Sequence, residues 1–237
     1  MRADARNVSK QTREALVRRI SSTVGLTDEE RIQINSVSSE SRAKGSLIAE
    51  DGDFKRSCFL ISGWAIRQAF LSDGKRQISG FIVPGDPLGP FSCLGEVVSS
   101  GIVAITPVEV WDLGRANSAQ AALPVVERFD MVMAREHLRF DRNQMIRLGC
   151  HSALQRMAHL LLELDERLAA VGLVSQGMFD FPLTQEMLGD ALGLSVVHVN
   201  RTMKQLREAG LLQQRDNFLQ ILNQKRLEDL SEYAAPP

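Results

Sequence analysis

Hydrophobic residues recur three and four positions apart in two consecutive blocks near the C-terminal end of the chain. The first block follows Thr184, a residue type that caps helix N-termini, and stops at Gly193, which can adopt the left-handed conformation that ends helices. The second block follows Ser195 and stops at Gly210. The pattern predicts two short helices joined by a three-residue turn, which is a helix-turn-helix.

The second predicted helix carries Val197, Arg201 and Lys204 on one outward face, because they occupy positions i, i+4 and i+7. A recognition helix presents such residues to DNA base edges in the major groove, and arginine is suited to two hydrogen bonds with guanine. A helical hairpin without DNA-binding function can show the same pattern. We select eight residues as candidates for DNA contact: Thr184, Gln185, Ser195, Val196, Val197, His198, Arg201 and Lys204.

A short β-hairpin is predicted directly after these helices. The polar, turn-forming residues 213–217 separate Leu211 and Leu212 from the mostly apolar run 218–222. Two short strands joined by such a turn form the wing of a winged helix. The hairpin therefore favours a DNA-binding domain over a simple helical hairpin.

The N-terminal half of the chain has a different pattern. Residues 1–24 predict a short helix with a frayed start, and Thr27 with Glu30 forms a capping box that opens a second helix to about Val37. From residue 46 to residue 113, short β-rich runs alternate with Gly, Asp and Pro. This alternation predicts an antiparallel barrel or jelly roll, whose interior could hold a small molecule.

Helical spacing returns at about residue 122 and continues to residue 150. One stripe has the 3-4 spacing of a coiled-coil seam, with a single polar member, and favours a parallel two-fold dimer. A second stripe, which includes Phe129, can pack on the barrel, and Gly149 is predicted to interrupt the helix. A helix buried within its own chain remains the alternative. The candidate seam residues are Met131, Ala134, Leu138, Asp141, Met145 and Leu148.

The segment LTQEMLGDALGLSVVHVNRTMKQL resembles the winged helix of the Crp/Fnr family of bacterial transcription regulators, and VHVNR is similar to the FixK-like branch. Several turns lie where that family places turns of its effector domain, so the resemblance covers roughly residues 26–230. The turns are Gly52-Asp53, Ser62-Gly63, Asp73-Gly74, Pro84-Gly85-Asp86 and Gly89. In addition, family members carry Arg and Glu where this chain has Val196 and Val197, which implies a different operator.

Pattern and resemblance together predict an α+β fold with three parts. Residues 1–121 form an antiparallel β-barrel of jelly-roll type, like a cyclic-nucleotide-binding domain, with N-terminal helices. Residues 122–150 form the dimerisation helix, and residues 151–237 form a winged helix-turn-helix DNA-binding domain. A length of 237 residues is sufficient for two domains with separate cores.

Charge and apolar content narrow the function classes. The net charge of −1 indicates no general affinity for nucleic acid, but residues 196–226 hold six Lys or Arg against two acids, which gives 6 − 2 = +4 locally. No apolar run is long enough to span a membrane, and the N-terminus lacks the apolar core of a signal peptide. We therefore expect a cytoplasmic protein with no membrane partner.

The barrel sequence does not favour a cyclic nucleotide. The resemblance implies that a phosphate would be held by a Gly-Glu-Leu turn and a later Arg-Ser pair, and Gly95-Glu96 matches only the start of that turn. Residues 77–114 contain no Lys or Arg, and a buried phosphate without a cation is costly. Arg67 and Arg76 are possible cationic contacts, although strand arginines are more often solvated.

Cofactors are not expected either, so we predict neither a metal site nor a cofactor. The histidines are His137, His151, His159 and His198, none of them within the barrel strands, which argues against a His-ligated metal there. Cys58, Cys93 and Cys150 are too few and too widely spaced for a disulfide framework or a zinc site. None of them precedes residue 58, which excludes the N-terminal cysteine cluster that holds iron–sulfur clusters in the oxygen-sensing branch. For haem, His137 is the sole axial candidate on the long helix.

These observations predict a transcription regulator that binds double-stranded DNA as a homodimer on an inverted repeat, and that contacts RNA polymerase if it is an activator. The effector is unknown, and effector-free control is favoured over an unidentified small ligand. The alternative is a ligand-sensing or interaction module whose C-terminal domain docks protein. An enzyme is not expected, because no set of nucleophile, base and orienting group is visible.

Overall fold

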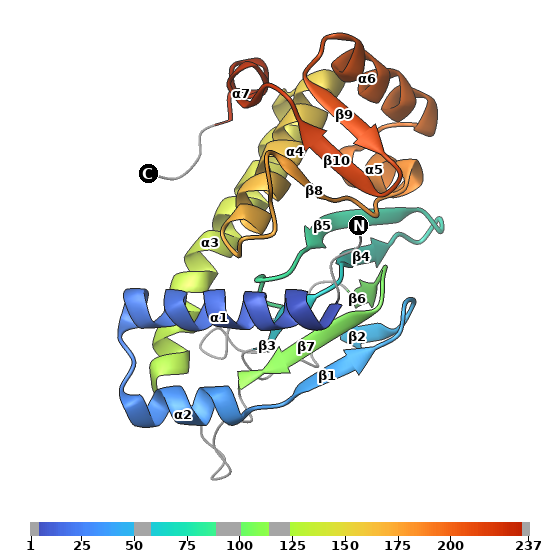
Figure 1. Cartoon of the computed structure of the whole chain (residues 1–237). Helices are drawn as coiled ribbons and strands as arrows, with labels where there is room; N and C mark the ends of the chain where they lie inside the picture. The colour runs from blue at the N-terminus through green and yellow to red at the C-terminus, as the bar shows by residue number, and fades with distance from the viewer. Residues whose placement is uncertain (1–4, 50–57, 89–100, 114–123, 234–237) are drawn as a thin grey trace. The chain divides into compact units, whose positions relative to one another are not determined.

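The computed structural model describes residues 5–49, 58–88, 101–113 and 124–233 (Figure 1). By their contacts the residues form two compact units. The first consists of Met1–Ala69 and Phe81–Phe140, and the second of Phe70–Gly80 and Asp141–Pro237. The boundary thus falls inside one long helix, and the tip of one hairpin belongs to the second unit.

The first unit is built on antiparallel strands. The strand order is β1-β7-β3 in one sheet and β2-β6-β4-β5 in the other. The strands are β1 (Ser39–Arg42), β2 (Leu47–Ala49), β3 (Cys58–Ser62), β4 (Ala65–Phe70), β5 (Arg76–Ile82), β6 (Gly101–Ala104) and β7 (Val108–Asp112). The β-rich runs predicted between residues 46 and 113 are therefore strands, whereas β1 was not predicted from the sequence.

Two helices precede these strands: α1 (Ala5–Val24) packs against β3 of the β1-β7-β3 sheet, and α2 (Asp28–Ser36) leads into β1 (Figure 1). The capping box predicted at the start of α2 is present, with Thr27 and Glu30 bonded to each other in both directions. The apolar face of α1 joins Phe59 and Trp111 in a core cluster. The Trp111 indole donates to the carbonyl of Val37 over 3.1 Å, so the buried ring has its hydrogen-bond partner.

The helix α3 (Pro124–Cys150) continues through Gly149, so the predicted interruption at that residue is wrong. A single helical glycine costs only about 1 kcal/mol relative to alanine. The break comes at Ser152, which caps the next helix through a capping box with Gln155. The stripe residues Val125 and Phe129 are fully buried in the same cluster as Trp111.

The second unit contains the winged helix-turn-helix. Its elements after α3 are α4 (Ala153–Ala169), β8 (Met178–Asp180), α5 (Gln185–Leu192), α6 (Val196–Glu208), β9 (Leu212–Arg215), β10 (Phe218–Ile221) and α7 (Gln224–Ser231). The strands form a sheet of order β8-β10-β9, next to α5 and α6 in Figure 1. The predicted pair of wing strands is present, but β9 continues to Arg215, so residues 213–215, which were predicted to be part of the turn, pair with β10 instead. The elements β8 and α7 were not predicted from the sequence pattern.

Some predicted features fall outside the described residues. These are the turns at Gly52-Asp53 and Gly89, the Gly95-Glu96 segment and Cys93. None of the helices in the described ranges is both long enough and apolar enough to cross a membrane.

Candidate nucleic-acid interface

The first helix of the motif begins and ends where the sequence predicts. Thr184 is the N-cap of α5, and its hydroxyl accepts a hydrogen bond from the backbone N–H of Met187 over 3.2 Å. At the other end, Gly193 has φ 64°, the left-handed conformation that suits glycine. These two residues fix the length of α5 and the direction in which the chain leaves it.

A second glycine lets the two helices approach closely. A Cβ atom at Gly189 would lie 2.6 Å from the carbonyl oxygen of Leu194, which is backbone and cannot move aside easily. The N–H of Leu194 donates to the carbonyl of Gly189 over 3.0 Å. The tight turn therefore depends on Gly189, whose only sequence signal is a glycine inside an otherwise helical pattern.

The recognition helix candidate, α6, is amphipathic. Ser195 is its N-cap and accepts from the backbone N–H of His198 over 3.3 Å. Its inward face consists of Val199, Thr202, Met203 and Leu206, which are all buried. The opposite face is exposed, and Val197 on it is 75% exposed, so this side chain is accessible to a ligand.

The outward face of α6 gathers the predicted contact residues. The exposed residues are Val196, Val197, His198, Arg201 and Lys204, together with Asn200, which was not predicted from the sequence. Asn200 follows Val197 by one turn, and its amide type can pair with adenine. The His198 ring is hydrogen-bonded to the Ser195 hydroxyl over 2.9 Å, which holds it at the helix N-terminus.

Charge on this face is unevenly distributed along α6. Lys204 lies 3.6 Å from Glu208 in an exposed i,i+4 pair, so part of its charge is balanced within the helix. The first turn of α6 contains no acidic residue. Backbone N–H groups at a helix N-terminus attract phosphate, so the absence of a carboxylate there suits an approach to DNA.

The carboxyl end of α5 is held by side chains from three other elements. The last four carbonyls of a helix lack intrahelical partners. Here the carbonyl of Asp190 accepts from Gln77 over 2.8 Å, that of Ala191 from Gln144 over 2.6 Å, and that of Leu192 from Arg156 over 2.9 Å. The fourth, Gly189, accepts from the backbone of the turn.

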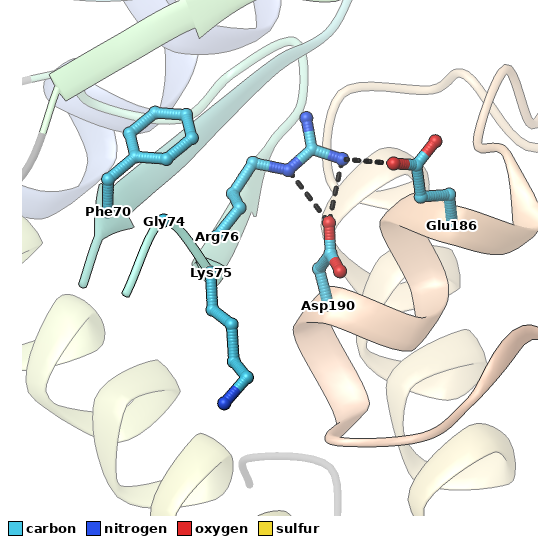
Figure 2. Close-up of a pocket in the computed structure, with 6 residues that line it drawn as sticks. All are labelled: Phe70, Gly74, Lys75, Arg76, Glu186 and Asp190. Carbon is cyan, nitrogen blue, oxygen red and sulfur yellow. Dashed lines mark hydrogen bonds and ion pairs between the residues drawn. The ribbon is translucent and has the colours of Figure 1, made fainter. Parts of the chain in front are cut away.

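Figure 2 shows the tip of the β4-β5 hairpin, which belongs to the same unit, facing α5 across a pocket of about 440 Å³. Arg76 points at Asp190, with 2.7 Å between its guanidinium and the carboxylate, while Glu186 lies 3.9 Å away and Lys75 is directed elsewhere. The charge of Arg76 is therefore engaged by carboxylates. Arg67, the other cation considered for a phosphate, is hydrogen-bonded to His137.

A buried polar cluster lies beside α4. The Arg147 guanidinium pairs with the Glu163 carboxylate, and its Nε donates to Nδ1 of His159 over 3.2 Å. Burial raises the pKa of Glu163, but the charges of Arg147 and Arg167 outweigh this effect and hold the pKa below its ordinary value. Burial and the charge of Arg147 lower the pKa of His159 from 6.5 to about 4, so this ring is neutral at pH 7.

The candidate dimer seam on α3 is partly exposed within one chain. Met131, Leu138 and Met145 are 57%, 69% and 67% exposed and recur every seven residues. Asp141 is also exposed and Leu148 is partly buried, whereas Ala134 is buried in the core of its own unit. The seam as proposed from the sequence therefore combines an exposed apolar stripe with one residue already covered.

The described part of the chain contains no group of three or more His, Cys, Asp or Glu residues that could hold a metal ion. Cys58 is buried, and Cys150 is exposed at the end of α3.

Comparisons with known families agree with this geometry. Residues 155–230 match the family described as "Crp-like helix-turn-helix domain", and residues 40–122 match the family described as "Cyclic nucleotide-binding domain". The first match spans α4 to α7, and the second spans the strands of the first unit. Both matches correspond to the predicted fold class, which is thereby confirmed.

Individual proteins are similar along most of the chain. The nitrogen fixation regulation protein FixK of Rhizobium meliloti is 30% identical, over 73% of this chain and 76% of its own length. The transcriptional activator protein FnrA of Stutzerimonas stutzeri is 28% identical, over 76% of this chain and 75% of FnrA. The solved structure of FixK2 from Bradyrhizobium japonicum has a TM-score of 0.70 and 29% identity, and the match covers 84% of this chain and 99% of the FixK2 chain.

Proposed function

The chain belongs to the Crp/Fnr family of DNA-binding transcription regulators, and from this premise we propose that it acts as a homodimer on an inverted-repeat operator. The observation that carries the proposal is the outward face of α6. It presents Val197 and Arg201 to solvent from a helix whose N-terminus is capped and free of acidic residues. Such a helix fits the major groove.

Each of the contact residues predicted from the sequence is assigned a role by its chemistry. Arg201 reads guanine through two hydrogen bonds, and Val197, with Val196 beside it, offers apolar contact to a thymine methyl. Lys204 binds backbone phosphate and contributes affinity without sequence preference. Ser195 and His198, at the helix N-terminus, are also assigned to phosphate. Thr184 and Gln185, at the start of α5, are assigned to the phosphate backbone as well, because the first helix of the motif crosses it.

The proposed dimer forms along the exposed stripe of α3 between two copies of this chain. Apolar side chains that recur every seven residues on one helix match the seam of a parallel two-stranded coiled coil. A two-fold dimer would place its recognition helices roughly 34–36 Å apart, so half-site centres would lie about 10 base pairs apart.

Regulation is proposed to be independent of cyclic nucleotide, iron–sulfur cluster and haem, with the protein's own abundance as the controlling variable. The support against a cyclic nucleotide is the lack of Lys and Arg between residues 77 and 114 and the engagement of Arg76 by Asp190, and the support against an iron–sulfur cluster is that no cysteine precedes Cys58. The proposed site of action is the bacterial cytoplasm, where the DNA lies. If the protein activates transcription, RNA polymerase would be a further partner.

The test begins with selection of binding sites from random-sequence DNA by the full-length protein, followed by mobility-shift titrations. Arg201→Ala should weaken binding to the selected site by roughly 1–3 kcal/mol and relax one base position, whereas Lys204→Ala should weaken all sequences alike. Arg18→Ala, on the exposed face of α1, is the matched control and should change neither. Equal losses on selected and random DNA for Arg201→Ala would refute its role. Failure to enrich any inverted repeat would favour a protein-docking domain instead.

A further inference from the structure

A chain of hydrogen bonds connects the last turns of α3 with the carboxyl end of α5. It starts at Glu163 of α4, whose carboxylate pairs with Arg147 of α3, and these side chains are only 4% and 3% exposed. Nη1 of Arg147 donates to Oε1 of Gln144 over 2.8 Å. The amide nitrogen of Gln144 then donates to the carbonyl of Ala191 over 2.6 Å. Three helices of the second unit are thereby linked by side chains in sequence.

Both oxygens of the buried Glu163 carboxylate, where this series of hydrogen bonds starts, have partners. Asn143 donates to the same oxygen of Glu163 over 3.1 Å, and Arg167 lies 3.3 Å from the other oxygen. A buried ion pair of this kind is weak evidence for stability, because desolvation of the two charges offsets most of their attraction. What such a network supplies is geometry, since each member has one orientation in which its bonds are made.

The carbonyl that receives the last bond occupies a sensitive place. Ala191 lies in the final turn of α5, two residues before Gly193, and α6 begins at Val196. A shift of this turn would therefore be passed directly to the recognition helix. The residue on the opposite side, Gln144, is adjacent to the exposed seam residue Met145.

We propose that Gln144 and Arg147, held by Glu163, are positioning residues that fix the turn before the recognition helix to the seam-bearing end of α3. This inference rests on the proposed function as a dimer on an inverted repeat. In that dimer the hydrogen-bond chain sets the separation and rotation of the two recognition helices. It thus determines which half-site spacing the protein accepts, and not how tightly one half-site is bound.

Affinity should depend strongly on half-site spacing, because DNA is a helix. Each added base pair moves the half-sites apart by about 3.4 Å and rotates one relative to the other by about 34–36°. A rigidly positioned pair of recognition helices cannot follow that change. The wild-type protein is therefore expected to prefer one spacing over its neighbours by about tenfold or more, which corresponds to 1.4 kcal/mol.

The experiment uses the full-length protein and two variants. Gln144→Met removes the donor to Ala191 at similar side-chain length, and Arg147→Met removes the donor that orients Gln144 while Glu163 keeps Asn143 and Arg167 as partners. Gln33→Met, on α2, is the matched control for the first variant. Affinities are measured by fluorescence anisotropy on duplexes whose half-site spacing changes one base pair at a time, and on a single half-site.

Both variants should bind the single half-site within about threefold of wild type, while their spacing preference falls below about threefold or moves to another spacing. Gln33→Met should retain the wild-type preference. Variants that keep the wild-type spacing preference would overturn the proposal, and so would a parallel loss of half-site binding or of the thermal unfolding transition, because these indicate a role in stability alone. If the wild-type protein itself selects no inverted repeat, the proposed function fails before the positioning role is reached.

Discussion

Replacing Leu138 by glutamate tests the proposed dimer seam most directly. Leu138 is 69% exposed in the single chain and lies midway between Met131 and Met145, seven residues from each. Burying a leucine side chain completely contributes roughly 1.5–3 kcal/mol, so about two thirds of that, ~1–2 kcal/mol, remains to be gained in the dimer. Two-fold symmetry places two such leucines at the interface, which gives ~2–4 kcal/mol.

The loss of that contribution predicts a large change in self-association. Since each 1.4 kcal/mol is a factor of ten, the dimer dissociation constant should rise roughly 30-fold to 700-fold for Leu138→Glu. Two carboxylates facing each other across the seam add to this value, because neither gains a partner. Binding to the inverted repeat should fall with the loss of dimer, while binding to a single half-site stays close to wild type.

Sedimentation velocity over a concentration series measures the dissociation constant, and mobility shifts on the palindrome and on one half-site measure the consequence. Ile32→Glu is the matched control, because Ile32 is 71% exposed on α2 and lies off the seam. A Leu138→Glu protein that sediments as the wild-type dimer and still binds the palindrome would refute the placement of the interface on this face of α3.

Three further outcomes are expected. Cyclic AMP or cyclic GMP should shift neither melting temperature nor DNA affinity, whereas a ligand at a hundred times its dissociation constant would add about 2.7 kcal/mol, several degrees by scanning fluorimetry. The pKa of His159 is about 4 in the folded chain and 6.5 ordinarily, so the unfolded chain binds its proton first as the pH falls. The free energy of unfolding should therefore drop by about 1–2 kcal/mol from pH 7 to pH 5, and His159→Gln should reduce that drop. Gly189→Ala should cost about 1–3 kcal/mol because its Cβ meets the Leu194 carbonyl, while Gly149→Ala, with open space around it, should be neutral or stabilising.

Features encoded within a few residues could be predicted from the sequence. The caps at Thr27, Thr184 and Ser195 each depend on a side chain that reaches a backbone group three residues away. The chemistry of such a cap is complete in a four-residue window, so composition and order suffice. The same holds for Gly193, whose left-handed conformation ends α5.

Elements that depend on distant partners were missed. The strand β1, with the sequence SESR, has no apolar alternation, and it is a strand because it pairs with β7 at the edge of a sheet. In the same way, β8 is a three-residue strand that pairs with β10 about 40 residues later. Strand formation at such positions is decided by the neighbouring strand and not by local propensity.

The candidate site likewise contains residues that could be predicted from local sequence and residues that could not. The outward residues of α6 followed from helical spacing, but Gln144 resembles any polar residue on a helix, and its contact with Ala191 joins residues 47 positions apart. Ala134 was assigned to the seam because periodicity identifies a stripe without saying what covers it. Its burial in the core of the first unit depends on the packing of the whole unit.

The hydrogen bonds at the end of α5 affect whether this DNA-binding region can be transferred intact to another protein. Of the three side chains that satisfy its final carbonyls, Gln77 and Gln144 lie outside the segment from α4 to α7, and only Arg156 lies within it. A chimaera that transplants residues 151–237 onto a foreign scaffold would leave two carbonyls to solvent at the turn that aims the reading helix. Grafts that carry the last three turns of α3 along would retain one of those two donors. The natural unit of exchange in this protein is therefore larger than the segment that reads as its DNA-binding domain.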